Sequence, residues 1–110
     1  MTDPLLAARA LLVHDLAARG LTDSGAMTLV EDVVQQRRWW LESWPQGAEV
    51  VAGQVAQDMQ ERLLDETGCR WPECPLHDGS HELRIDPDLG PDPHWVCEDA
   101  GEVVAPLGAL

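Results

Sequence analysis

Cysteine and histidine side chains crowd into one short stretch of this chain, residues 69–97, and they constrain its fold more than any other feature. All three cysteines and three of the four histidines fall within it: Cys69, Cys74, His77, His81, His94 and Cys97. The stretch is also rich in proline and glycine, and the segment 69–110 is too short to fold stably around a hydrophobic core alone. Disulfides or a metal ion usually stabilise such segments. The odd number of cysteines argues against a disulfide framework, so we expect a bound metal.

The spacing of these residues favours zinc. Cys74 and His77 stand in C-x2-H spacing, which lets a thiolate and an imidazole reach one tetrahedral ion. Five residues compete for four coordination positions. Our first choice is a structural Cys2His2 zinc site formed by Cys74, His77, His81 and Cys97. The second is a Cys3His site in which Cys69 replaces His81.

A catalytic metal is the main alternative, because a small metal-dependent hydrolase needs an open coordination position and an acidic general base. Glu98 and Asp99 directly follow Cys97 and would supply that base. However, the residues between His77 and His81 are Asp-Gly-Ser, which do not favour a helix, and the glutamate of an H-E-x-x-H motif is absent. Four protein ligands would leave no open position. We therefore favour structural zinc and predict no catalytic residues.

The residues around these ligands also carry a family pattern. Segments 71–77 (WPECPLH), 81–83 (HEL) and 95–97 (WVC) form a W-P-x-C-P-x-H…H-x-L…W-x-C tail. This tail resembles that of short uncharacterised zinc-ribbon-like proteins of GC-rich bacteria, which have a helical N-terminal half and end near a G-x-L. The last three residues, GAL, are similar to that ending. The resemblance implies zinc ligation by Cys74, His77, His81 and Cys97, leaves Cys69 outside the pattern, and implies no activity.

Residues 1–68 are predicted to form about three amphipathic helices. The first begins at Asp3-Pro4, an N-cap followed by proline at the first helical position, and ends before Gly20. The second is expected over 28–44, where apolar residues recur every three or four positions until a proline interrupts the helix. The third is expected over 48–67, and the glycine that follows it favours a helix end. Helices of this kind pack against one another or against a partner.

Residues 69–110 are predicted to form a small antiparallel sheet. Short β-like runs cover 81–86, 94–98 and 102–106, and the prolines, aspartates and glycines between them favour turns. Three strands joined by such turns form a meander. We therefore predict an α+β fold, in which a helical segment 1–68 and a zinc-ribbon-like β module 69–110 pack together as one compact unit.

Acidic residues dominate the charge of the chain. It carries 20 acidic residues and 7 basic ones, and the segment 69–110 alone holds a net charge of −7 out of −13. An acidic surface repels nucleic-acid phosphates and favours a protein partner with a basic surface. We therefore predict a non-enzymatic interaction or adaptor protein that does not bind nucleic acid directly. A weaker alternative is an acidic nucleic-acid mimic that occupies the basic groove of another protein.

Five tryptophans supply all the large aromatic packing surface, because phenylalanine and tyrosine are absent. Trp39, Trp40 and Trp44 fall in the second predicted helix, where they offer a surface for homo-oligomer formation. No run of roughly 18 apolar residues is present, so we expect no membrane span. The N-terminus lacks the basic region of a secretory signal, and we therefore expect a cytoplasmic protein.

Overall fold

Helix α1 begins and ends where the sequence predicts. The computed structural model describes residues 3–76 and 81–110, and α1 spans Pro4–Ala17. The carboxylate of Asp3 accepts a hydrogen bond of 2.9 Å from the backbone N–H of Leu5, and this bond holds the pKa of Asp3 below its usual value. After the helix the chain reverses through Gly20, which has a positive φ of 71°. The predicted N-cap and stop are therefore confirmed.

Helix α2 spans Ser24–Ser43 and begins four residues earlier than its hydrophobic pattern indicates. The reason is its cap, because the Asp23 carboxylate accepts a hydrogen bond of 2.8 Å from the N–H of Ala26. Ser24 and Gly25 therefore belong to the first turn of the helix. The helix ends at Ser43, one residue before its predicted end, and the chain breaks at Pro45 as predicted.

A short 3-10 helix, η1 (Pro45–Glu49), connects α2 to helix α3 (Val51–Thr67). The predicted third helix therefore begins at Val51 and not near residue 48. It ends as expected at Gly68, which adopts the left-handed conformation with a φ of 71°. Trp40 and Trp44 meet edge to face across this bend, with ring centroids 5.1 Å apart.

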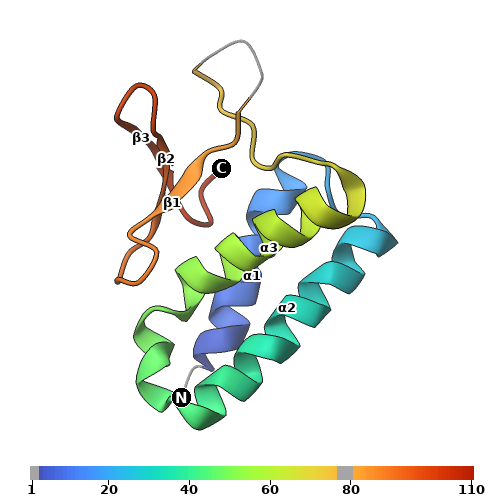
Figure 1. The fold of residues 1–110 in the computed structure, drawn as a ribbon, viewed down its shortest axis with the longest axis vertical. Helices are drawn as coiled ribbons and strands as arrows, with labels where there is room; N and C mark the ends of the chain where they lie inside the picture. Colours follow the sequence, from blue (N-terminus) through green and yellow to red (C-terminus); the bar gives the residue numbers. More distant parts are fainter. Residues whose placement is uncertain (1–2, 77–80) are drawn as a thin grey trace.

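The sheet is the predicted antiparallel meander, with strands β1 (Arg84–Asp86), β2 (His94–Cys97) and β3 (Glu102–Pro106) in the order β1-β2-β3. Trp95 pairs with Ile85 on one side and with Ala105 on the other. Strand β1 begins at Arg84 and not at residue 81 as predicted. The reason is that residues 81–83 pair with residues 72–74 and not with β2. The three helices lie side by side, and the sheet stands against them (Figure 1). The α+β prediction is confirmed.

One hydrophobic core includes residues from both the helices and the sheet. Trp71 and Trp95 lie at its sheet side with ring centroids 5.2 Å apart in an edge-to-face arrangement, and they are 1% and 0% exposed. By contrast, Trp39 is 66% exposed on the outer surface of α2. No helix within residues 3–76 and 81–110 is long and apolar enough to cross a membrane.

A buried carboxylate joins the sheet and the C-terminal residues to α1. Asp15 is fully buried, and it accepts hydrogen bonds from the indole N–H of Trp95 at 2.8 Å and from the backbone N–H groups of Gly108 and Leu110 at 2.6 and 2.9 Å. The chain end consequently lies between the sheet and the helices (Figure 1). This contact fixes the position of β2, the strand that ends at Cys97.

Candidate metal centre

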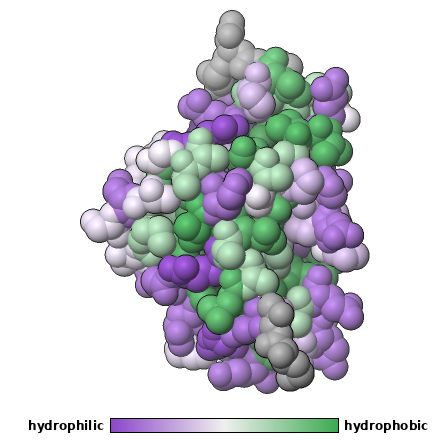
Figure 2. Space-filling view, turned by 180° about the vertical axis from the view of Figure 1, so that it is seen from behind, coloured by the Kyte–Doolittle hydropathy of each residue, from purple (hydrophilic) through white to green (hydrophobic). Residues whose placement is uncertain are grey.

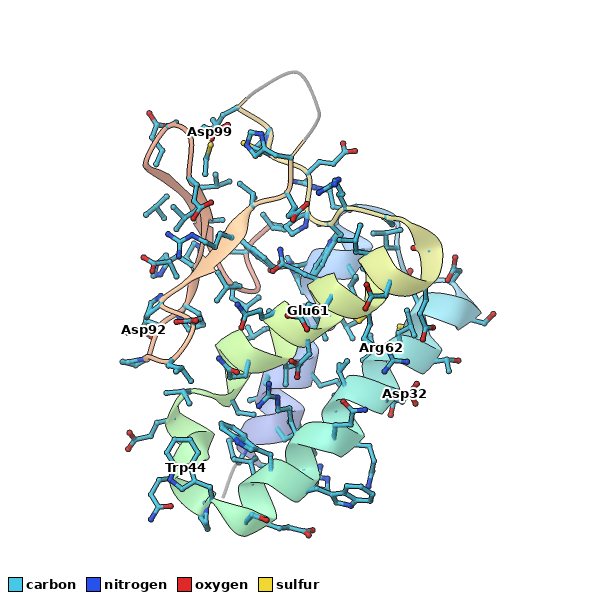
Figure 3. The ribbon with its side chains drawn as sticks, in the orientation of Figure 1. Asp32, Trp44, Glu61, Arg62, Asp92 and Asp99 are labelled. Carbon is cyan, nitrogen blue, oxygen red and sulfur yellow. The ribbon has the colours of Figure 1, made fainter. Side chains whose placement is uncertain are left out.

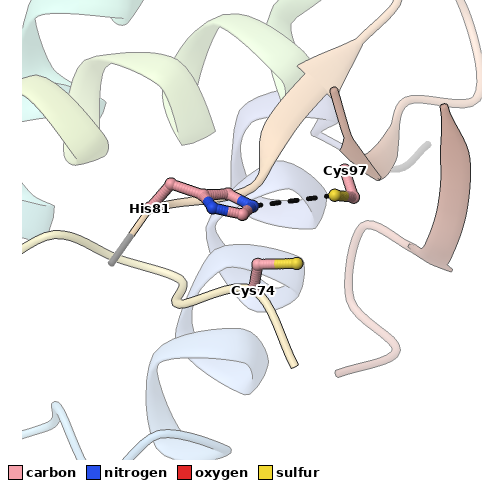
Figure 4. Close-up of side chains that lie close together, drawn as sticks. All are labelled: Cys74, His81 and Cys97. Carbon is pink, nitrogen blue, oxygen red and sulfur yellow. Dashed lines mark hydrogen bonds between the residues drawn. The ribbon is translucent and has the colours of Figure 1, made fainter. Parts of the chain in front are cut away.

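Cys74, His81 and Cys97 converge at one end of the sheet, although they come from three separate parts of the chain (Figure 4). One ligand atom from each, a sulfur or a ring nitrogen, lies within 4.8 Å of the other two. The two cysteines are buried, at 4% and 0% exposed, whereas the His81 side chain is 30% exposed. This group could hold a metal ion.

The backbone places Cys74 beside His81. The N–H of Cys74 donates a hydrogen bond of 3.0 Å to the carbonyl of His81, and the N–H of Leu83 donates one of 2.8 Å to the carbonyl of Pro72. These bonds flank an antiparallel bridge between residues 73 and 82. The two ligands therefore lie on neighbouring chain segments whose separation the backbone fixes.

Helix α3 holds this pair of segments through one side chain. The amide nitrogen of Gln60 donates hydrogen bonds of 3.1 Å to the carbonyl of Trp71 and 2.7 Å to the carbonyl of Leu83. Gln60 therefore connects the helical half of the chain to both segments that carry ligands. Sequence reasoning did not find it, because a single glutamine on a helix face carries no signal of a distant partner.

The imidazole of His81 has a defined orientation. Its Nε2 atom lies 3.6 Å from the sulfur of Cys97, and its Nδ1 atom lies 3.7 Å from a carboxylate oxygen of Asp99. Asp99 belongs to the turn between β2 and β3 and is labelled near the top of Figure 3. The nitrogen nearer the cysteine sulfur is thus Nε2, and the carboxylate faces the other side of the ring.

A family model for a domain of unknown function (DUF8819) matches residues 1–107. The chain belongs to this family. The matched range includes the helices, the sheet and the Cys74–His81–Cys97 cluster. No curated protein and no solved structure matches the chain.

Three of the four preferred ligands, Cys74, His81 and Cys97, thus come together in this DUF8819 domain. His77 lies outside the described residues. Cys69, the alternative ligand, is half-buried just after α3 and is not among the grouped ligand atoms; it lines surface hollows together with Leu21. Asp99, which the sequence suggests as a general base, faces Nδ1 of His81.

Proposed function

We propose that this DUF8819 protein is a non-enzymatic interaction protein in which a structural zinc ion holds Cys74, His81 and Cys97 together. The observation that carries the proposal is the convergence of two sulfurs and one imidazole nitrogen within 4.8 Å. Thiolate and imidazole are the ligands that structural zinc sites use. The chemistry of these donors therefore fits zinc better than calcium or magnesium, which prefer oxygen ligands.

The spacing of the donor atoms supports the same proposal. A sulfur at about 2.3 Å and a nitrogen at about 2.0 Å from a tetrahedral ion are about 3.5 Å apart. The distance between the Cys97 sulfur and Nε2 of His81 is 3.6 Å. The two donors thus stand about as far apart as two ligands of one ion.

A fourth protein ligand would close the site. His77 is our first choice, because it follows Cys74 by three positions, and the resulting Cys2His2 set is common in structural zinc sites. In the alternative Cys3His set, Cys69 takes the place of His81 and His77 is kept. A closed site leaves no place for a reactive water, and this favours a structural ion over a catalytic one.

The position of Asp99 also favours a structural role. A general base for hydrolysis would have to face a metal-bound water, whereas Asp99 faces Nδ1 of His81, away from the nitrogen near Cys97. A carboxylate at that position orients a histidine ligand and sets which nitrogen carries the proton. We therefore assign Asp99 to positioning His81.

The acidic surface of the C-terminal module supports a basic protein partner. Arginines pair with some of its acids, namely Glu82, Asp86 and Glu98. Within the described residues, its other exposed carboxylates have no arginine partner: Glu73, Asp88, Asp92, Asp99 and Glu102. On the face seen in Figure 2, hydrophilic and hydrophobic patches interleave, which favours an interaction protein over a nucleic-acid mimic.

The proposal places the protein in the cytoplasm, where a reducing environment keeps cysteine thiols available to bind zinc. Cobalt substitution tests the ligands and the closure of the site together. The cobalt protein should show the intense visible bands of a tetrahedral thiolate site. Cys74→Ser and Cys97→Ser should abolish these bands, and Cys69→Ser should leave them unchanged.

Three results of this experiment would count against the proposal. Bands that survive Cys74→Ser and Cys97→Ser would remove both residues from the site. A spectrum that shifts when a small anion such as azide is added would reveal an exchangeable coordination position, and would favour the hydrolase alternative. If Cys69→Ser removed the bands while His81→Ala kept them, Cys69 would replace His81 as the fourth ligand.

A further inference from the structure

Two adjoining hollows form a groove between α2 and α3. The larger, about 740 Å³, lies over the N-terminal half of α2 and the C-terminal half of α3, and the smaller, about 360 Å³, lies against Trp39. Asp32 and Arg62 line both hollows, so the two meet at this ion pair. Figure 3 shows Arg62 of α3 beside Asp32 of α2. We call this surface the α2–α3 groove.

The floor of the groove is apolar and its rim is acidic. Leu29 and Leu63 are almost completely buried beneath it. Its charged lining consists of three carboxylates and one guanidinium: Asp23, Asp32, Glu66 and Arg62. Arg62 already binds two of these acids, with N···O distances of 3.1 Å to both. The rim therefore keeps a net negative charge after its internal pairing.

Trp39 stands at the end of the smaller hollow. Its side chain is 66% exposed, although tryptophan has the largest side chain and buries a large apolar area when it packs. Exposed tryptophans next to a hollow are typical binding hot spots, because they bury a large area when a partner docks. Gln35 and Gln36 beside it add hydrogen-bonding groups without charge.

We infer that the α2–α3 groove binds an amphipathic helix with basic flanks from a partner protein. Its apolar residues would lie over the leucine floor, and its lysines or arginines would pair with the acidic rim. Along α2, the residues from Ala26 to Trp39 span roughly 20 Å at 1.5 Å per residue, which is the length of three to four helical turns.

A second copy of this chain fits the groove less well, because each copy carries a net charge of −13. The inference rests on the interaction role proposed above and adds a docking surface in the helical half to the acidic surface of the C-terminal module. The groove contains none of the three grouped metal ligands. Zinc content is therefore measured on the same samples. Protein that contains zinc but does not bind the peptide would refute the groove inference alone, whereas protein without zinc would refute the proposed metal site.

The test uses the full chain, labelled with 15N, and a synthetic 16-residue helical peptide with leucines at i, i+3, i+4 and i+7 and lysines elsewhere. A scrambled peptide of the same composition is the control for non-specific charge attraction. At physiological salt, the amphipathic peptide should shift the backbone amide NMR signals of α2 and of the second half of α3, and the indole N–H signal of Trp39. It should bind roughly tenfold more tightly than the scrambled peptide.

Two surface variants and their controls localise the binding. Trp39→Ala and Glu66→Lys should each weaken binding by roughly fivefold or more. Leu89→Ala and Glu49→Lys, at exposed positions outside the groove, should leave it unchanged. Equal binding of both peptides, shifts confined to the sheet, or unaltered affinity of Trp39→Ala would overturn the inference. A dimer in sedimentation analysis that Trp39→Ala dissociates would assign the groove to a second copy, and would also overturn it.

Discussion

The indole N–H of Trp95 donates a hydrogen bond of 2.8 Å to the carboxylate of Asp15, which lies 80 residues earlier in the chain. Both side chains are fully buried. The same carboxylate accepts two backbone N–H groups of the C-terminal residues. Because Trp95 lies two residues before Cys97 in β2, this contact ties the position of one metal-ligand candidate to helix α1.

Replacing this carboxylate should strongly destabilise the fold. Asp15→Ala leaves the buried Trp95 indole N–H and two partly buried backbone N–H groups without their acceptor, and we expect a loss of about 3 kcal/mol or more in the free energy of unfolding. Urea denaturation measures it. Asp65→Ala, at an exposed position on α3, is the control and should change stability by less than about 0.5 kcal/mol. A loss no greater than that of the control would contradict this role for Asp15.

Gly108 should tolerate a side chain less well than Gly101. Both adopt positive φ, at 92° and 65°. A Cβ at Gly108 would overlap Leu11, whereas a Cβ at Gly101 would meet no atom within 4 Å. We expect Gly101→Ala to cost about 1 kcal/mol for its backbone conformation, and Gly108→Ala at least about 2 kcal/mol because a clash is added. Thermal and urea unfolding compare the two, and equal losses would show that the chain end does not pack tightly against α1.

Arg37 should not be replaceable by lysine. Its guanidinium binds both carboxylate oxygens of Asp58, at 2.6 and 2.9 Å, and lies 4.7 Å from the centre of the Trp40 ring. A lysine cannot reproduce this two-bond geometry or the stacking. We expect Arg37→Lys to destabilise the protein by about 1 kcal/mol, because the pair is only partly exposed.

The control for Arg37 is Arg19→Lys. Arg19 is exposed and has no carboxylate partner within the described residues, so its replacement should leave stability nearly unchanged. A double-mutant cycle with Asp58→Ala separates the ion pair from the contact with Trp40. Equal effects of the two lysine variants would refute the predicted role of the guanidinium geometry.

Asp99 should influence metal affinity without being a ligand. Its carboxylate lies 3.7 Å from Nδ1 of His81, and we propose that it orients the imidazole of the zinc-bound His81. Loss of such an orienting group typically lowers metal affinity roughly 10- to 100-fold. We expect Asp99→Asn to weaken zinc binding in competition with a chelating dye while the cobalt spectrum keeps its tetrahedral form. Glu102→Gln is the matched control, and an affinity of Asp99→Asn equal to that of this control would exclude the positioning role.

Local signals explain why so much of the fold could be predicted. The Asp3-Pro4 start, the break at Pro45 and the end at Gly68 depend on backbone chemistry within a few residues, and all three occur as predicted. The predicted start of α2 was wrong because it relied on the hydrophobic pattern, which begins later than the cap. The carboxylate of Asp23 caps the helix and sets where it begins.

Long-range contacts explain what could not be predicted. Residues 81–83 pair with residues 72–74, so β1 is shorter than its β-like run. The sequence does contain one overlooked signal, because Asp15 follows Leu12 by three positions and therefore falls on the apolar face of α1. An acid in such a position needs a buried partner, but only the fold shows that the partner is Trp95. The crowding of cysteine and histidine into residues 69–97 did predict that Cys74, His81 and Cys97 converge, because few side chains can serve as metal ligands.

Zinc content, combined with thermal unfolding before and after removal of the metal, shows whether a structural zinc ion holds this domain together. The full chain, purified without chelators, should contain one zinc ion per molecule by elemental analysis. Zinc that binds only the folded state stabilises it, so a strong chelator should lower Tm and added zinc should restore it. Wild-type protein that is folded, free of zinc and equally stable with and without chelator would contradict the account.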